Sequence, residues 1–351
     1  MTTDVSAPDA VAAIRHTSRR LLDLVERQMS DFLAAERLKW AELNPRAVVP
    51  IEAVTTLVEA GGKRIRPAFC VSGFLAAGGD PDDRRVVHAA IALELLHACA
   101  LIHDDVMDAS PQRRGMPTVH AHHSELHSDR RWQGEARRFG ESVAILAGDL
   151  ALIYSDQFMA NTPAANAVWN ELRAELIVGQ YLDIGAAAEF SVDPQLSRQI
   201  AIAKSGGYTI HRPLVVGASI AGRPELAGVF EVYGTALGEA FQLRDDLIDA
   251  FGDAEVTGKP AGLDFDQHKM TLLLALAMQR DDQVRELVLG AVPDAVKLRE
   301  ALISSGVRAA VEDRITALVA QSCRAIADAP IAREWRDELT AMTYEIAYRD
   351  R

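Results

Sequence analysis

One 25-residue stretch constrains the fold more than any other part of the chain. The segment 84–108, RRVVHAAIALELLHACALIHDDVMD, is apolar almost all round at helical periodicity. A helix with so few polar positions is typical of the interior of a helical bundle. Four polar residues interrupt the run: His88, Glu94, His97 and His103. They disfavour a membrane-spanning helix, so the stretch predicts a long buried helix.

Helical periodicity also covers most of the remaining chain, and the alternation that is typical of strands is scarce. Further helices are predicted at 15–39, 141–159, 165–186, 194–221, 226–252 and 270–289. Short turn sequences separate them, and no repeat of 20–50 residues is present. The fold class is therefore all-α, a single large helical bundle of ten or more helices. We expect residues 1–14 to be a flexible tail and 15–351 to be one domain.

Charge and cysteine content exclude several classes of function. The 351 residues carry a net charge of −13, which disfavours nucleic acid or an anionic membrane as a partner. The three cysteines form neither a disulfide framework nor a zinc spacing, and Cys70 and Cys99 are expected to be small core residues. The first ten residues lack the basic and apolar regions of a signal peptide. A cytoplasmic location is the expectation.

The segment 121–140, AHHSELHSDRRWQGEARRFG, is the polar exception and is expected to be an exposed connection or short helix. His123 and His127 have the i, i+4 spacing of a metal-binding pair. No carboxylate or cysteine partner has a matching spacing, so a solvated loop is the preferred interpretation.

Three aspartates end the apolar run at 84–108. Asp104 and Asp108 are four residues apart and lie on one face of a helix, with Asp105 beside them. Like charges at this spacing destabilise a helix by a few tenths of a kcal/mol, and a divalent cation reverses that effect. Oxygen ligands of this kind suit Mg²⁺, which completes its shell with water and substrate phosphates.

The same pattern recurs at the end of the second apolar run. One DDxxD motif alone is weak evidence, because acidic helix ends are common, but Asp245, Asp246 and Asp249 repeat the spacing in LRDDLIDAFG. Two such helices packed together would direct six carboxylates to one cavity mouth. The repeat predicts several Mg²⁺ ions that bridge the two motifs and a diphosphate.

Basic residues gather near the aspartate motifs although the protein is acidic. They are Lys63, Arg64 and Arg66 in AGGKRIRP, Arg113 and Arg114 after the first motif, Lys204 beside Ser205, and Lys259 and Lys269. Each cluster alone could be ordinary surface charge. Together they indicate an anion site, because guanidinium groups make planar, bidentate contacts with phosphate oxygens.

Several motifs occur together in a characteristic order between residues 59 and 273. They are GGKRIRP, ELLHACALIHDDVMD, RRGMPTVH, GQYLDI, KSGG and FQLRDDLIDAFGDAEVTGKPAGLD. In these motifs the chain resembles the trans-isoprenyl (polyprenyl) diphosphate synthases, which include geranylgeranyl and farnesyl diphosphate synthases. The resemblance implies an isoprenoid-synthase bundle around a deep central cavity, usually a homodimer. It also implies Mg²⁺-dependent, head-to-tail (1′-4) condensation of isopentenyl diphosphate with an allylic diphosphate.

The resemblance also implies roles for individual residues. Magnesium would be held by Asp104, Asp108 and Asp245, with Asp105, Asp246 and Asp249 assisting. The allylic diphosphate would be held by Arg113, Lys204, Ser205, Gln242, Lys259 and Lys269. Isopentenyl diphosphate would be held by Lys63, Arg66, His97 and Arg114, with Arg64 nearby, and Gln180 and Asp183 match a Q-x-x-D motif on a facing helix. His268 stands where the family has a glycine, which puts the contact of Lys269 in question.

Product length depends on the residues that precede the first motif. Cys99 and Ala100 lie one helical turn before Asp104, and one turn of about 5.4 Å is close to one isoprene unit. In the resembling family, bulky aromatics there stop products at fifteen carbons, so two small residues favour a twenty-carbon product. A floor supplied by Leu93, Leu96 or a facing helix would give fifteen carbons, and no floor would give longer chains. Alternatively, the small residues merely allow close helix packing.

Three other functions make distinct predictions. A terpene cyclase would release a hydrocarbon, but it needs neither the second anion site nor a complete second motif. A phosphohydrolase, suggested by the dipeptide His103–Asp104, would release phosphate and leaves the repeated motif unexplained. A non-catalytic partner subunit would show no turnover, yet all six aspartates are present.

Overall fold

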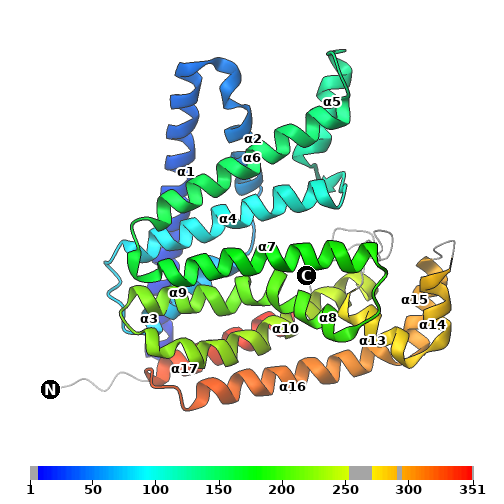
Figure 1. Ribbon diagram of the computed structural model, residues 1–351. Helices are drawn as coiled ribbons and strands as arrows, with labels where there is room; N and C mark the ends of the chain where they lie inside the picture. The colour runs from blue at the N-terminus through cyan, green and yellow to red at the C-terminus, as the bar shows by residue number, and fades with distance from the viewer. Residues whose placement is uncertain (1–6, 253–270, 291–294, 350–351) are drawn as a thin grey trace.

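The computed structural model describes residues 7–252, 271–290 and 295–349, which are almost entirely helical. The helices are α1 (Ala7–Leu43), α2 (Val49–Glu59), α3 (Ile65–Ala76), α4 (Arg85–Met107), α5 (Val119–Asp129), α6 (Ala136–Met159), α7 (Asn166–Ala188), α8 (Pro194–Ile200), α9 (Arg212–Ile220), α10 (Ala227–Phe251), α13 (Leu272–Arg280), α14 (Asp282–Leu289), α15 (Ala295–Ser304), α16 (Val307–Ala327) and α17 (Arg333–Ala347). A π-helical segment, η3 (Ala201–His211), joins α8 to α9, and short 3₁₀ turns cover Pro45–Val48, Pro163–Ala165 and Pro224–Leu226. Two-residue strands β1 (Gln112–Arg113) and β2 (Met116–Pro117) form one hairpin. The all-α prediction is confirmed (Figure 1).

Most predicted helices are present, but some boundaries differ. The two apolar runs form α4 and α10 within one or two residues of the expected ends. The expected helix 194–221 is divided into α8, η3 and α9, and the expected helix 270–289 is divided into α13 and α14. Helix α1 begins at Ala7, inside the segment 1–14 that was expected to be a tail.

Helix α4 forms the centre of the bundle. It packs against α6, α3 and α1 (Figure 1), and Ile91, Leu93, Leu95 and Ile102 are at most 1% exposed. Burial of each such side chain contributes roughly 1.5–3 kcal/mol. By length and composition α4 is apolar enough to cross a membrane, but 72% of its apolar window is buried inside the protein. It is a core helix, as predicted.

Of the two structures expected for 121–140, the short helix is confirmed, and the interpretation of His123 and His127 as part of a solvated loop is wrong. Residues 119–129 form helix α5, which packs against α6, and both histidines are buried, His123 at 9% and His127 at 4% exposure. The His127 ring lies against Trp132 and its Nε2 is 3.1 Å from the Gln133 carbonyl oxygen. Gly140 permits the close approach, since a Cβ there would lie 2.1 Å from a backbone oxygen of α5. The histidines are packing residues.

Another buried histidine, His211, predicts a pH dependence of stability. Burial, together with the neighbouring Arg212, lowers the pKa of His211 from 6.5 to about 4. The folded state therefore resists protonation that the unfolded state accepts, and stability is lost as the pH falls from about 6.5 to about 4. This shift corresponds to about 3 kcal/mol. The free energy of unfolding is measured with urea at pH 7.5 and at pH 4.5. We expect the loss between these two pH values to be smaller in His211→Gln than in the wild type, by up to about 3 kcal/mol. Equal losses in the two proteins would contradict the assignment.

Candidate active site

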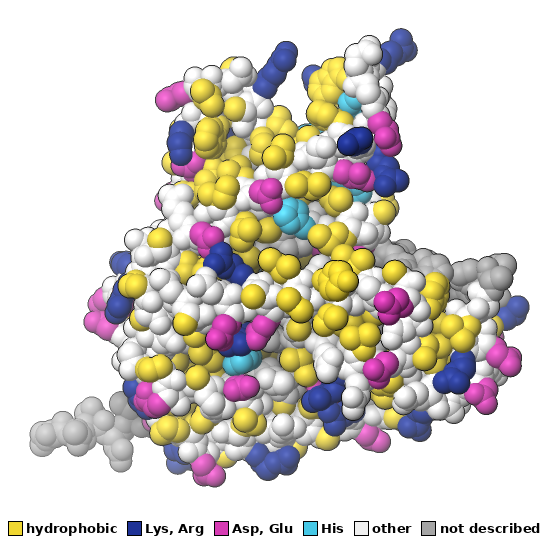
Figure 2. All heavy atoms as spheres, viewed as in Figure 1, with side chains coloured by type: hydrophobic (Ala, Val, Ile, Leu, Met, Phe, Trp, Pro, Cys, Tyr) yellow, Lys and Arg dark blue, Asp and Glu magenta, His cyan; other side chains and the backbone are white. Residues whose placement is uncertain are grey.

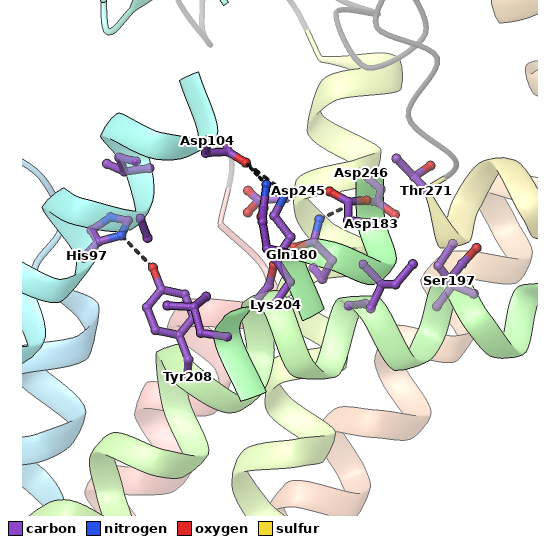
Figure 3. A pocket seen from close by; sticks show the side chains of 18 of the residues that line it. His97, Asp104, Gln180, Asp183, Ser197, Lys204, Tyr208, Asp245, Asp246 and Thr271 are labelled. Carbon is purple, nitrogen blue, oxygen red and sulfur yellow. Dashed lines mark hydrogen bonds and ion pairs between the residues drawn. The ribbon is translucent and has the colours of Figure 1, made fainter. Parts of the chain in front are cut away.

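A cavity of about 320 Å³ lies where α4, α7, α10 and η3 meet, and we call it the anion pocket. The first aspartates of both motifs, Asp104 from α4 and Asp245 from α10, line it. Figure 3 shows their side chains together with Lys204, Gln180 and Asp183 around the same space. The predicted site residues that line the pocket are Arg66, His97, Ala100, Asp104, Arg113, Gln180, Asp183, Lys204, Ser205, Gln242, Asp245 and Asp246. The structure thus brings together residues that lie up to 180 positions apart.

Asp104 is the centre of the polar contacts in this pocket. Its Oδ1 accepts hydrogen bonds from Lys204 Nζ and from Gln180 Nε2, both at 3.0 Å. Lys204 Nζ also donates to Asp183 Oδ2 at 2.5 Å. The Lys204 ammonium therefore links two carboxylates from different helices, Asp104 near the C-terminal end of α4 and Asp183 of α7.

Asp105 has a different role from its neighbour. It is 3% exposed and faces Arg113, whose Nη2 lies 2.7 Å from Asp105 Oδ1 and 3.5 Å from Asp104 Oδ2. Burial raises the pKa of Asp105, and the contact with Arg113 opposes that rise. Arg113 lies on the β1–β2 hairpin, whose turn residues Arg114 and Gly115 both have positive φ, as a tight two-residue turn requires. Asp105 therefore positions Arg113 at the pocket.

In the second motif, too, the two adjacent aspartates differ in burial and in their partners. Asp246 is 3% exposed and accepts hydrogen bonds from Gln242 Nε2 at 2.9 Å and from the backbone N–H of Leu273 at 3.4 Å. Asp245 is half exposed and pairs with Arg349, which comes from the C-terminal end of the described chain. Asp108 and Asp249, the last residues of the two motifs, are both half-buried.

The π-helical segment η3 places Lys204 and Ser205 against α10. π-Helical turns occur mostly at functional sites, because they change the direction in which side chains point. Gly206 of η3 and Gly238 of α10 touch so closely that a Cβ on Gly238 would lie 2.4 Å from the Gly206 Cα. No larger residue fits at this crossing, and the close contact brings Lys204 and Gln242 into one pocket.

Tyr208 is a site residue that the sequence interpretation missed. It lies one helical turn after Lys204, and its hydroxyl shares a hydrogen bond of 2.7 Å with His97 Nδ1 (Figure 3). The Arg66 guanidinium stacks on the Tyr208 ring at 4.0 Å from the ring centroid. Burial lowers the pKa of His97 well below 6.5, with Arg66 and Arg114 adding to the effect, so His97 is neutral. The signal that could have identified Tyr208 is its i, i+4 spacing from Lys204.

Arg66 has one buried N–H group, at Nε, without a hydrogen-bond acceptor among the described residues. Its Nη2 donates to Thr209 Oγ1 at 2.8 Å, but its buried Nε has no hydrogen-bond partner in the described part of the chain. An unsatisfied buried donor is costly, and an anionic ligand would satisfy it.

Some predicted residues lie outside the lining of the anion pocket. Arg64 is held by Glu26 and Glu94, and Arg114 donates to the Gly61 carbonyl oxygen. Lys63 lines a neighbouring surface groove that also contains Arg349. Lys259, His268 and Lys269 lie outside the described residues.

A second, larger cavity adjoins the anion pocket. This tail groove has a volume of about 730 Å³, lies between α4, α6 and α7, and shares Ala100, Asp104, Leu176 and Gln180 with the anion pocket. Its other walls are mainly apolar and include Leu96, Cys99, Leu152 and Ile177. Ala100 therefore stands at the junction of the two cavities, and Cys99 lies beside it in the lining of the tail groove, where a bulky side chain would fill the space next to the junction.

The donor chemistry of the anion pocket fits Mg²⁺ bound together with a diphosphate. Among the described residues no three His, Cys, Asp or Glu side chains form a ready-made metal cluster. Mg²⁺ does not need one, because it binds through one or two carboxylates and takes water and substrate phosphates as its other ligands. Asp104 and Asp245 supply carboxylates to one pocket, and Arg66, Arg113 and Lys204 supply the positive charge that a diphosphate requires.

Comparison with known proteins identifies the family. The polyprenyl synthetase family model matches residues 50–302. A short chain isoprenyl diphosphate synthase from Methanothermobacter thermautotrophicus is 34% identical over 259 residues, which cover 71% of this chain and 73% of the relative. A nonaprenyl diphosphate synthase from Mycobacterium tuberculosis is 31% identical over 273 residues, covering 76% of each chain.

A solved structure agrees with these matches. The geranylgeranyl pyrophosphate synthase from Corynebacterium glutamicum, complexed with isoprenyl diphosphate and magnesium, superimposes with a TM-score of 0.88 and 36% identity, covering 95% of this chain and 99% of that one. The relatives make products of different lengths, so the family alone does not define the product. The chain belongs to the polyprenyl synthetase family and is a prenyltransferase of the isoprenyl diphosphate synthase class.

Proposed function

We propose that this prenyltransferase makes geranylgeranyl diphosphate by repeated head-to-tail (1′-4) addition of isopentenyl diphosphate to an allylic diphosphate. One observation carries the proposal: the anion pocket adjoins a mainly apolar groove, with the small residue Ala100 in the lining of both and the small residue Cys99 next to it in the groove. The polar pocket suits a diphosphate, and the groove suits a hydrocarbon tail longer than ten carbons.

Charge placement supports ionisation of the allylic substrate. Bound Mg²⁺ would neutralise charge on the leaving diphosphate, held there by Asp104, Asp108 and Asp245. Arg113 and Lys204 lie within 3.5 Å of Asp104 and add fixed positive charge beside the leaving group. Stabilisation of charge that develops in the transition state is the largest catalytic effect of such groups.

The second substrate would bind on the side of Arg66, His97 and Tyr208. The unsatisfied Arg66 Nε suits an oxygen of isopentenyl diphosphate, and neutral His97 keeps the Tyr208 hydroxyl in place. The double bond of isopentenyl diphosphate attacks C1 of the allylic cation, and the proton lost from its C2 passes to the departing diphosphate. Apolar walls such as Leu176 and Ile200 keep water from the cation.

A bulky residue at the junction should shorten the product. Cys99→Phe places an aromatic ring in the lining of the tail groove, next to its junction with the anion pocket. We expect the main product to change from twenty to fifteen carbons, with the turnover of dimethylallyl diphosphate retained within about threefold. Mass spectrometry of dephosphorylated products measures the change.

A suitable control adds the same ring away from the groove. Leu38→Phe lies on an exposed surface of α1 and should leave the product at twenty carbons. A twenty-carbon product from Cys99→Phe would contradict the route of the tail past this position.

We also propose that two copies associate through the face formed by α6 and α7. Figure 2 shows hydrophobic side chains gathered on this face, and the large exposed ones are Ile145, Leu146, Ile153, Ile177, Val178, Tyr181 and Ile184. An exposed apolar area of this kind is typical of a protein interface. Sedimentation equilibrium tests for the homodimer.

The proposal includes a reducing, cytoplasmic location, supported by three cysteines that are all unpaired.

The deciding experiment is an elongation assay. Purified protein is mixed with Mg²⁺, isopentenyl diphosphate and each of the five-, ten- and fifteen-carbon allylic diphosphates, and product length is determined by mass spectrometry. A twenty-carbon diphosphate is expected from all three starters. A fifteen-carbon end product would keep the reaction and move the floor of the groove closer to Asp104. Binding of diphosphates without elongation would favour a partner subunit, and a hydrocarbon product would favour a cyclase.

A further inference from the structure

One end of the tail groove is lined by two polar residues, Asn170 and Arg173. Behind this lining, Arg173 is bonded to Asp156, which is bonded to Trp169, and we call these four connected residues the polar floor. Arg173 Nη1 lies 2.7 Å from both carboxylate oxygens of Asp156, and Arg173 Nη2 donates to Asn170 Oδ1 at 2.5 Å. Trp169 Nε1 donates to Asp156 Oδ1 at 2.8 Å, so helices α6 and α7 are tied together at this point.

The position of the cluster along α7 sets the length of the groove. Gln180 contacts Asp104 at the junction, and Asn170 lies ten residues earlier on the same helix. Ten residues of α-helix span about 15 Å, which corresponds to roughly three isoprene units at one unit per turn. The groove between the junction and the polar floor therefore accommodates a fifteen-carbon allylic tail.

The chemistry of the cluster opposes a fourth unit. A hydrocarbon offers no acceptor to the guanidinium and no donor to the carboxylate, so it cannot replace any of the bonds that it would displace. The Asp156 and Arg173 side chains are 47% and 25% exposed, so the floor also lies near the protein surface. A fourth isoprene unit would therefore have to displace the ion pair without replacing its bonds.

We propose that the Asp156–Arg173 ion pair, with Asn170, is the floor that determines product length, an inference that rests on the proposed function. A fifteen-carbon substrate fits above this floor and is extended to twenty carbons. To bind again as an allylic substrate, the twenty-carbon product would need a groove that is one isoprene unit longer. Elongation therefore ends at twenty carbons.

The test compares the binding of non-hydrolysable prenyl thiodiphosphates with ten, fifteen and twenty carbons, together with turnover. The variant Asp156→Asn with Arg173→Leu removes both charges, and its asparagine keeps an acceptor for Trp169 Nε1. We expect the ratio of the twenty-carbon to the ten-carbon affinity to rise about tenfold. Products of twenty-five carbons or more should appear in the same variant. Calorimetry measures the affinities, and mass spectrometry measures the products.

A control removes an ion pair with the same N–O distance elsewhere on α6. Arg137→Leu with Glu141→Gln breaks a 2.7 Å pair within that helix, and neither residue lines either cavity. The affinity ratio should stay at the wild-type value in this control. A second floor variant, Asn170→Leu, changes an exposed position. It replaces the double variant in the same affinity test if the double variant does not fold.

The outcomes separate the two proposals. A raised ratio in the floor variants alone supports the polar floor. An unchanged ratio in a folded floor variant overturns it, as does equal wild-type affinity for the fifteen- and twenty-carbon analogues. A wild-type protein that elongates no starter refutes the proposed function, and the analogue affinities still decide the question of the floor because they need no turnover.

Discussion

Asp104→Ala is expected to lower kcat for elongation by about 10³-fold while the fold remains intact. Asp104 accepts hydrogen bonds from Lys204 and Gln180 and lies beside Arg113, so it is the carboxylate on which the pocket's cations converge. Its loss removes a proposed Mg²⁺ ligand at the leaving diphosphate. The measurement is the rate of product formation from geranyl and isopentenyl diphosphates over a Mg²⁺ titration, with circular dichroism to check folding.

The matched control is another aspartate at the end of a helix. Asp129 ends α5, is exposed, and lines neither the anion pocket nor the tail groove. Asp129→Ala should retain activity within about twofold, as surface substitutions usually do. If Asp104→Ala kept more than a third of the wild-type rate, the assignment of the first motif to metal and leaving group would be wrong.

The elements that could be predicted from the sequence are those whose structure follows from the local pattern of apolar residues. Helices α4 and α10 are apolar almost all round, and a run of that length has few alternatives to a buried helix. The aspartates that end these two helices could be paired from sequence because they repeat one spacing. Their meeting in one pocket agrees with the expected arrangement, since both helices must pack inside the same bundle.

The less predictable part depends on which partners the tertiary structure supplies. Arg64 and Arg66 are two residues apart, yet Arg64 pairs with Glu26 and Glu94 whereas Arg66 stacks on Tyr208 in the pocket. Nothing in GGKRIRP distinguishes them, because the choice is made by side chains on other helices. The same is true of α5, whose polar sequence hides the buried face that packs against α6.

The tail groove was only partly predictable for a similar reason. Cys99 and Ala100 could be identified from α4 alone, since they lie one turn before Asp104. At the opposite end, Arg173 of α7 lines the groove and forms an ion pair with Asp156 of α6, so the contact joins two helices. Periodicity places each residue on its helix, but the contact depends on how α6 and α7 are oriented.

Lys204→Gln is expected to lower kcat/KM for the allylic diphosphate by about 10²–10³-fold. Lys204 Nζ is 3.0 Å from Asp104 and 2.5 Å from Asp183, and its side chain is only 19% exposed. The ammonium is thus held at the point where the diphosphate is proposed to bind. Glutamine keeps a donor of similar reach but removes the charge, so the loss measures the electrostatic part of the interaction. Initial rates over a range of geranyl diphosphate concentrations give kcat and KM separately.

Magnesium dependence distinguishes this loss from the loss of a metal ligand. Lys204 neutralises Asp104 in the structure, so its removal leaves the carboxylate more attractive to a cation. The rate of Lys204→Gln should therefore saturate at the same or lower Mg²⁺ concentration than the wild type, and extra Mg²⁺ should not restore it. Lys39→Gln, which removes an exposed lysine paired with Glu36 at 2.9 Å, is the control and should behave as the wild type. Recovery of Lys204→Gln in high Mg²⁺ would show instead that the lysine acts through the metal, and the direct contact with diphosphate would have to be abandoned.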